Sequence, residues 1–282
     1  MQAIRHWLAP LSPAESAALL RELSDLESGS PRQWLLLEIA ATLGPGETSR
    51  RTRLIAFLAR GFGIAALLPL LERLRLPSVS LYRERAAALG RYARQAIDDA
   101  ALLLASFSAL LAGFDRLPAS RQFAAWLLLL IGGAIKLWRI RRRHPKPEPL
   151  EVSGEEVLPG AESALGLQGL LLAHGIAPRD ALALLAGLRA DPQSQIPVLV
   201  AALPALQPPA PARGDLLRAA LAGWSLTILP ALWLNGWQWG WIGAVLWAAA
   251  LCWIAHHRKT FILLLTATTL TSFGLARIAH FL

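Results

Sequence analysis

The sequence predicts an all-α, polytopic membrane protein with five transmembrane helices, a helical cytosolic head and a helical cytosolic insert between spans 2 and 3. Hydrophobic residues make up 55% of the 282 residues and charged residues only 17%, against about 25% in an ordinary globular domain. Several apolar runs are long enough to cross a bilayer, and no segment shows the two-residue period of a strand. Together these observations indicate a helical membrane protein.

The predicted spans are the segments in which about 30 Å of hydrocarbon can be crossed by one apolar helix. They are residues 97–114, 122–138, 219–234, 238–256 and 260–281. The last of them is interrupted only by Arg277, near its end. Residues 54–71 are a weaker sixth segment, because Arg60, two glycines and Pro69 interrupt them. An amphipathic or buried helix is favoured there, since a charged residue in mid-span is costly.

Lysine and arginine gather on one side of the predicted spans. The sequence RIRRRHPK (139–146) follows span 2, Arg213 and Arg218 precede span 3, and HHRK (256–259) separates spans 4 and 5. The positive-inside rule therefore predicts a cytoplasmic N-terminus. The opposite loop, NGWQWGW, is uncharged and rich in tryptophan, as expected at a membrane interface. We interpret the net charge of +9 as topology and lipid contact, because no nucleic-acid-binding motif occurs.

Helical segments are also predicted outside the membrane. A helix is expected from Ser12, which is followed by Pro13 and Glu15 in a capping-box pattern. Further helices are expected over RQWLLLEIAATL, over residues 49–76, and from Ser78 without interruption to Gly113. The insert reads as an acidic linker and three short helices, with breaks at HGIAP and ADPQ. The expected segments are a head (1–92), spans 1–2 (93–143), an insert (144–212) and spans 3–5 (213–282).

This layout resembles the vacuolar iron transporter family, which has five spans and a cytosolic helical domain between the second and third. LLLAHGIAPRDALALLAGLRADPQ is similar to the cytosolic pattern of that family, and RAALAGWSLTILPALWL is similar to its third span. Asp98-Asp99 stands where the family carries Asn-Asp-Gly. The N-terminal part resembles a reduced form of the ferritin-like, rubrerythrin-type domain that some bacterial members carry. We therefore expect a multi-pass protein of the bacterial inner (plasma) membrane.

The resemblance implies transport of Fe(II) or Mn(II) out of the cytosol in exchange for protons, by a homodimer. It assigns Asp98 and Asp99 to the transport path. The remaining acids that it assigns to metal binding are Glu27 and Glu72 in the head and Glu155, Glu156 and Glu162 in the insert. Glutamates without the expected partners also occur on solvated helix faces. No nucleophile-and-base or phosphate-loop motif indicates an enzyme.

The chain departs from the family pattern at several ligand positions. Ser30 stands where the Glu-x-x-His motif of the head needs histidine, and an Fe–carboxylate site needs such O and N ligands. In span 2, the methionine and glutamate of the family are replaced by Leu137 and by a basic residue near Arg139 or Arg141. Met1 is the only methionine. Gly132 and Gly133 are expected to permit close helix packing.

Three interpretations of Asp98 and Asp99 remain open. They form a metal or proton site, or they pair at the membrane surface with Arg94 or Arg139. In the third, Lys136 reaches Asp99 across the helix pair and a fixed ammonium replaces the transported cation. Two functions follow: a divergent divalent-metal transporter, or a transport-inactive scaffold or regulator that binds a partner protein.

Overall fold

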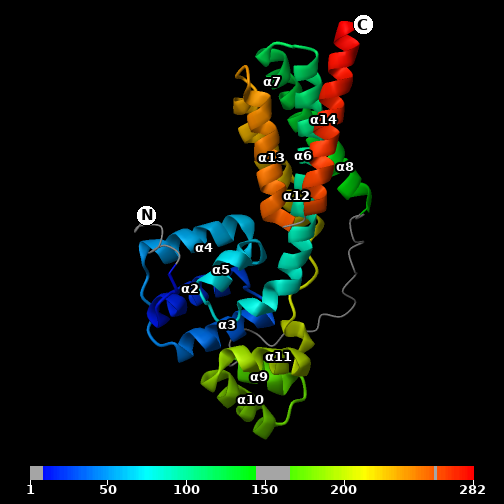
Figure 1. Ribbon diagram of the computed structural model, residues 1–282. Coiled ribbons are helices and arrows are strands. Elements are labelled where there is room, and N and C mark those ends of the chain that lie inside the picture. The colour runs from blue at the N-terminus through cyan, green and yellow to red at the C-terminus, as the bar shows by residue number, and fades with distance from the viewer. Residues whose placement is uncertain (1–8, 144–165, 257–258) are drawn as a thin grey trace. The chain divides into compact units, whose positions relative to one another are not determined.

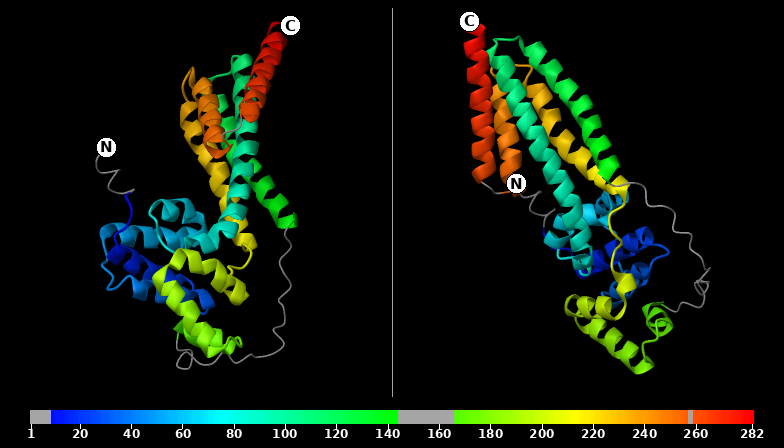
Figure 2. Two further views of the ribbon diagram at one scale, coloured as in Figure 1. Left: turned by 60° about the horizontal axis from the view of Figure 1, so that its bottom comes forward. Right: turned by 90° about the vertical axis from the view of Figure 1, so that its right-hand side faces the viewer.

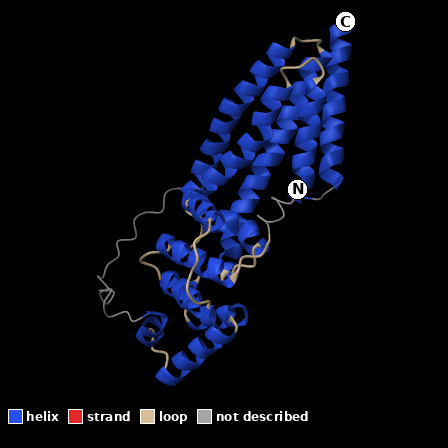
Figure 3. Ribbon diagram, turned by 90° about the vertical axis from the view of Figure 1, so that its left-hand side faces the viewer, coloured by secondary structure: helices blue, strands red, loops and turns tan. Residues whose placement is uncertain are grey.

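The computed structural model describes residues 9–143, 166–256 and 259–282. Within these ranges every regular element is a helix and none is a strand, as expected (Figure 3). The chain forms two compact units (Figure 1). The first unit comprises residues 1–87 and 149–210, and the second comprises residues 88–148 and 211–282. The segments predicted as head and insert thus lie mainly in one unit.

The first unit begins with α2 (Pro13–Leu26), whose N-terminus carries the expected capping box. The Glu15 backbone N–H donates to the Ser12 hydroxyl, and the Ser12 N–H donates to the Glu15 carboxylate, each over 3.2 Å. Burial raises the pKa of Glu15, but hydrogen bonds from Ser49 and Ser12 and the nearby Arg51 charge outweigh it and lower this pKa overall. The capping box thus provides hydrogen-bond acceptors for two of the N–H groups that lack a partner at the start of a helix.

The continuous helix expected over residues 49–76 is wrong. α4 (Arg50–Phe62) ends at Gly63, whose φ of 84° lies in the left-handed region that glycine adopts without steric cost. The chain then continues as η1 (Ile64–Leu67), α5 (Leu68–Arg73) and η2 (Val79–Tyr82). Residues 54–71 are therefore no single long helix, and they are not among the candidate membrane spans.

The insert forms α9 (Gly166–Ala173), α10 (Pro178–Ala190) and α11 (Pro192–Ala202), followed by η4 (Pro204–Leu206). α3 (Pro31–Thr42) packs against α2 and also against α9, α10 and η4. The three short helices and both breaks are as predicted. The Arg189 guanidinium on α10 lies 2.8 Å from the Glu38 carboxylate on α3, and this ion pair joins segments 151 residues apart.

The second unit is built from apolar helices that run alongside one another (Figures 1 and 2). Most of α6 (Arg83–Gly113) belongs to it, as do the elements α7 (Pro118–Leu127), η3 (Leu128–Gly132), α8 (Gly133–Arg143), α12 (Arg213–Leu234), α13 (Gly240–His256) and α14 (Lys259–Phe281). Four helical stretches are long and apolar enough to cross a membrane: Val79–Gly113, Pro118–Arg143, Arg213–Leu234 and Thr260–Phe281. The fourth predicted span, 238–256, forms α13, whose 17 residues extend about 25 Å.

Glycines set the closest helix approaches in the second unit. A Cβ on Gly223 of α12 would lie 2.3 Å from the backbone oxygen of Ala93 on α6. A Cβ on Gly132 would lie 2.3 Å from the indole of Trp224, and one on Gly133 would lie 3.6 Å from it. The role in close packing is confirmed for Gly132, whereas a side chain at Gly133 would make only an ordinary van der Waals contact. Residues 128–132 form a π turn opposite this tryptophan.

We expect Gly223→Ala to destabilise the protein, because the new methyl group meets backbone and forces α6 and α12 apart. The expected cost is about 1–3 kcal/mol, measured as a lower melting temperature of the purified protein in neutral detergent. Gly274→Ala on α14 is the matched control, since nothing lies within 4 Å of its Cβ. Equal melting temperatures for Gly223→Ala and wild type would show that the two helices are not in backbone contact.

Candidate functional site

Asp98 and Asp99 lie side by side on α6, fourteen or fifteen residues before its end at Gly113. At 1.5 Å per residue, Asp99 is about 21 Å along the helix from that end. In a bilayer with about 30 Å of hydrocarbon, this depth is inside the apolar region but close to one boundary. A carboxylate at that depth needs a partner or water.

Asp99 finds its partner on a neighbouring helix. The Lys136 Nζ on α8 donates to the Asp99 Oδ2 over 2.5 Å. The lysine side chain is only 11% exposed, whereas the aspartate side chain is 43% exposed. Of the three interpretations that the sequence left open, this contact corresponds to the one in which lysine crosses the helix pair.

The π turn before α8 affects where Lys136 points. A π turn holds about one residue more than an α turn, so it rotates the following residues by about 100° relative to an unbroken α-helix. Lys136 begins the second turn after Gly132, on the stretch that packs against α12. Its ammonium reaches the Asp99 carboxylate on a neighbouring helix.

The Lys136 ammonium repels any further cation that approaches the Asp99 carboxylate. Two unit charges of the same sign about 4 Å apart repel by about 4 kcal/mol at an effective dielectric constant near 20, and a divalent ion doubles this. A metal ion at this carboxylate must therefore displace the ammonium or share the acid with it.

Asp98 faces a different neighbour. It interacts with the thiol of Cys252 on α13, which is buried. The side chains of adjacent residues on an α-helix point about 100° apart, so the two acids face different helices. The structure does not bring Asp98 and Asp99 onto one ligand, and Asp99 alone contacts the lysine.

Glu27 lies in a buried polar cluster of the first unit. Its carboxylate accepts hydrogen bonds from the Arg32 Nε at 2.8 Å, from the Tyr82 hydroxyl at 2.9 Å and from the Ser30 hydroxyl at 3.3 Å. The side chains of Glu27 and Arg32 are only 12% and 11% exposed. Ser30, at the position where the family pattern has histidine, thus serves as a donor to this acid.

Glu72 is also occupied by an arginine. The Arg83 guanidinium lies 3.0 Å from its carboxylate in a solvent-exposed pair. Glu155, Glu156 and Glu162 lie outside the described residues. Over residues 9–143, 166–256 and 259–282, no group of three or more histidine, cysteine or acidic side chains gathers that could hold a metal ion. The metal-binding roles of these acids stay predictions from the resemblance.

Sequence reasoning identified the acids but missed several of their partners. Arg32 and Tyr82 lie 5 and 55 residues from Glu27, and no short motif links them. The ion pair between Asp99 on α6 and Lys136 on α8 could be predicted, because Lys136 is a lone lysine in an apolar span.

The fold defines an all-helical protein with four candidate membrane-spanning helices and an ion pair between two of them. No protein-family model, curated protein or solved structure matches the chain.

We expect Lys136 and Asp99 to be coupled in stability. Replacing one of them by a neutral residue (Lys136→Gln or Asp99→Asn) leaves the other charge unpaired. The two single changes should each lower the melting temperature by more than half of what the double variant loses. The expected coupling is about 1–3 kcal/mol. The exposed Arg218–Asp215 pair on α12, at 2.9 Å, is the control and should couple by about 0.5 kcal/mol or less. Equal coupling in the two pairs would argue against a buried contact.

Glu27→Ala should destabilise the first unit, because it leaves the Arg32 guanidinium buried without a counter-charge. We expect a loss of about 3 kcal/mol, seen as faster hydrogen–deuterium exchange in α2 and α3 of the full-length protein. Glu72→Ala removes the acid of an exposed pair and should cost less than about 1 kcal/mol. Slower exchange on adding Mn(II), abolished by Glu27→Ala, would instead identify Glu27 as a metal ligand.

Proposed function

We propose that the protein is a transport-inactive membrane scaffold or regulator in which the Lys136 ammonium takes the place of a transported cation. One observation carries the proposal: the Lys136 Nζ lies 2.5 Å from the Asp99 Oδ2. Asp99 is the acid that the resemblance to iron and manganese transporters assigns to the transport path. A covalently attached cation neutralises this acid and cannot leave it as a transported ion does.

The chemistry of the lost ligands supports the same conclusion. Mn(II) and Fe(II) prefer several oxygen or nitrogen ligands on facing helices. Leu137 and Lys136 occupy the part of span 2 where the family carries methionine, and neither side chain provides a metal ligand beside Asp99 as it is paired here. A hydrogen-bonded ion pair, and not a metal ion, stabilises the Asp99 carboxylate in the apolar region.

The proposal includes a five-span topology in the inner (plasma) membrane of a bacterium, with a cytoplasmic N-terminus. α8 ends in Arg141, Arg142 and Arg143, which favours the cytoplasmic side for that end. α13 is the fifth span in this topology. Its length of about 25 Å is short for a 30 Å hydrocarbon core, and local thinning of the bilayer accommodates such a mismatch at modest cost.

A scaffold needs surfaces for partners, and α4 offers one in the first unit. Leu54, Phe57 and Phe62 are 45%, 71% and 64% exposed on this helix. Arg50 and Arg60 are exposed on the same helix. Exposed apolar residues rimmed by charge are typical of interaction surfaces. The homodimer implied by the resemblance is part of this proposal.

Divalent-metal export is the second candidate function, and the exposure of Asp99 favours it. With 43% of its side chain exposed, the acid is reachable by a solute on one side of α6. In this case Lys136 would have to release Asp99 during each transport cycle, and protons exchanged for metal would neutralise the acid in between.

Transport assays in proteoliposomes separate the two functions. We expect no Mn(II) or Fe(II) uptake by the wild type above protein-free vesicles, because the ammonium occupies the acid. Lys136→Met should create Mn(II) binding, measured by equilibrium dialysis, since it removes the ammonium and frees the Asp99 carboxylate as an oxygen ligand. The double variant Lys136→Met/Asp99→Asn should lose this binding again.

Leu137→Met is the matched control, because it adds the same thioether one residue away and leaves the ammonium in place. It should bind no more metal than the wild type. Wild-type uptake that Asp99→Asn abolishes would overturn the scaffold function in favour of export. Absence of any gain in Lys136→Met would refute the idea that lysine replaces a cation.

A further inference from the structure

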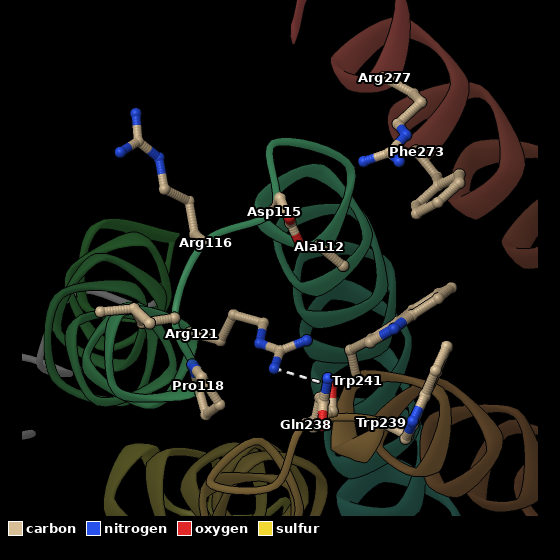
Figure 4. A pocket seen from close by; sticks show the side chains of 11 residues that line it. Ala112, Asp115, Arg116, Pro118, Arg121, Gln238, Trp239, Trp241, Phe273 and Arg277 are labelled. Atoms are coloured by element: carbon tan, nitrogen blue, oxygen red, sulfur yellow. Dashed lines mark hydrogen bonds between the residues drawn. The ribbon is translucent and has the colours of Figure 1, made fainter.

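We propose that a pocket at one end of the second unit binds a phosphate-bearing anion of the kind found in anionic phospholipid headgroups. The pocket has a volume of ≈ 620 Å³ and is formed by the end of α6, the start of α7, the loop before α13 and the last part of α14. Figure 4 shows its lining side chains. None of the residues discussed for Asp99 contributes to it.

The polar part of the pocket is built around Arg121. This residue is only 5% exposed. Its guanidinium donates to the backbone oxygen of Trp237 over 3.1 Å and to that of Gln238 over 2.9 Å, the second of which is drawn in Figure 4. Its Nε is buried and has no hydrogen-bond partner. A buried donor on a permanent cation is costly to leave open. Because Arg121 lines the pocket, an anion bound there would compensate the positive charge of this buried guanidinium.

The charge balance of the pocket is positive. Arg121, Arg277 and Arg116 line it, against the single carboxylate of Asp115. Among the described residues, none of these arginines forms an ion pair with a carboxylate. Arg277 instead lies over the ring of Phe281, 4.9 Å from its centroid, and extends toward the pocket, whereas Arg116 points outward from the rim (Figure 4).

The turn that ends α6 positions Asp115 at the pocket. The Arg116 N–H donates to the Leu111 oxygen and the Asp115 N–H donates to the Ala112 oxygen, the two bonds of a Schellman motif. This motif needs a left-handed residue, and Asp115 has a φ of 54°. Glycine is usual there, while asparagine also tolerates the conformation. Asp115 is therefore a non-glycine residue held in a less favourable conformation beside the arginines.

Aromatic side chains form the apolar part of the pocket. The Trp241 and Phe273 rings stack with centroids 5.3 Å apart and an interplanar angle of 9°. Trp239 also lines the pocket and is 71% exposed. Tryptophans at helix ends lie at the level of lipid headgroups, and clustered arginines attract headgroups that carry negative charge. A planar guanidinium fork matches two oxygens of a phosphate, which a lysine does not do.

The test uses the purified full-length protein in neutral detergent with three probes. These are dioctanoyl-phosphatidylglycerol, dioctanoyl-phosphatidylcholine and inorganic phosphate, titrated while the melting temperature is followed. We expect phosphatidylglycerol to stabilise the protein and phosphatidylcholine to have at most a weak effect, because its headgroup carries no net charge. Stabilisation by inorganic phosphate as well would identify a free phosphate as a sufficient ligand, whereas its absence assigns the pocket to the lipid.

Two variants of opposite sign test the location. Arg277→Gln should weaken phosphatidylglycerol binding by about tenfold, since a charge-assisted hydrogen bond is lost. Asp115→Asn keeps the left-handed residue but removes the negative charge, so binding should tighten. Arg91→Gln on α6 is the control for net charge, because Arg91 is exposed and does not line the pocket. Binding of neither anionic probe, or binding unchanged in both pocket variants, would overturn the proposal.

Discussion

The contact between the Lys136 ammonium and the Asp99 carboxylate is the interaction on which the interpretation of this protein depends. An acid about 21 Å from one end of an apolar helix requires compensation. The amine on α8 provides it at 2.5 Å, and it does so from a largely buried side chain. The acid is thus neutralised from within the chain, which under the proposed function makes it a structural element and not a carrier.

The packing of the second unit makes this contact possible. The α6 and α12 helices meet without a side chain between them at Gly223, and Gly132 leaves room for the Trp224 indole against the π turn. The helix that carries Lys136, α8, packs on α12 directly after that turn.

The predictable part of the fold depends on local signals. The Ser12 capping box, the long helix ending at Gly113 and the breaks at HGIAP and ADPQ each follow from a few neighbouring residues. The break at Gly63 was missed because helical periodicity continues on both sides of it, and only the left-handed φ reveals it. The π turn over residues 128–132 was not predicted, and in the fold Trp224 from another helix lies against its last residue, Gly132.

The candidate site was predictable to the same extent. A lone lysine in one apolar span and an acid in another predict an ion pair, because neither charge is tolerated alone there. The cluster around Glu27 and the pocket around Arg121 were not predictable, because their members come from distant parts of the chain. Arg121 directly precedes the predicted span 122–138, and only the fold brings it to the carbonyls of residues 237 and 238.

A distance measured in a lipid bilayer tests the central claim most directly. Lys136 is one of three lysines in the chain, with Lys146 and Lys259, so selective labelling of lysine Nζ with ¹⁵N and of aspartate Cγ with ¹³C gives few signals. Solid-state NMR should detect a dipolar coupling for a separation within about 4 Å, absent in Asp99→Asn and unchanged when Mn(II) is added. No coupling in the wild type, or a coupling that Mn(II) removes, would contradict a fixed ammonium at Asp99.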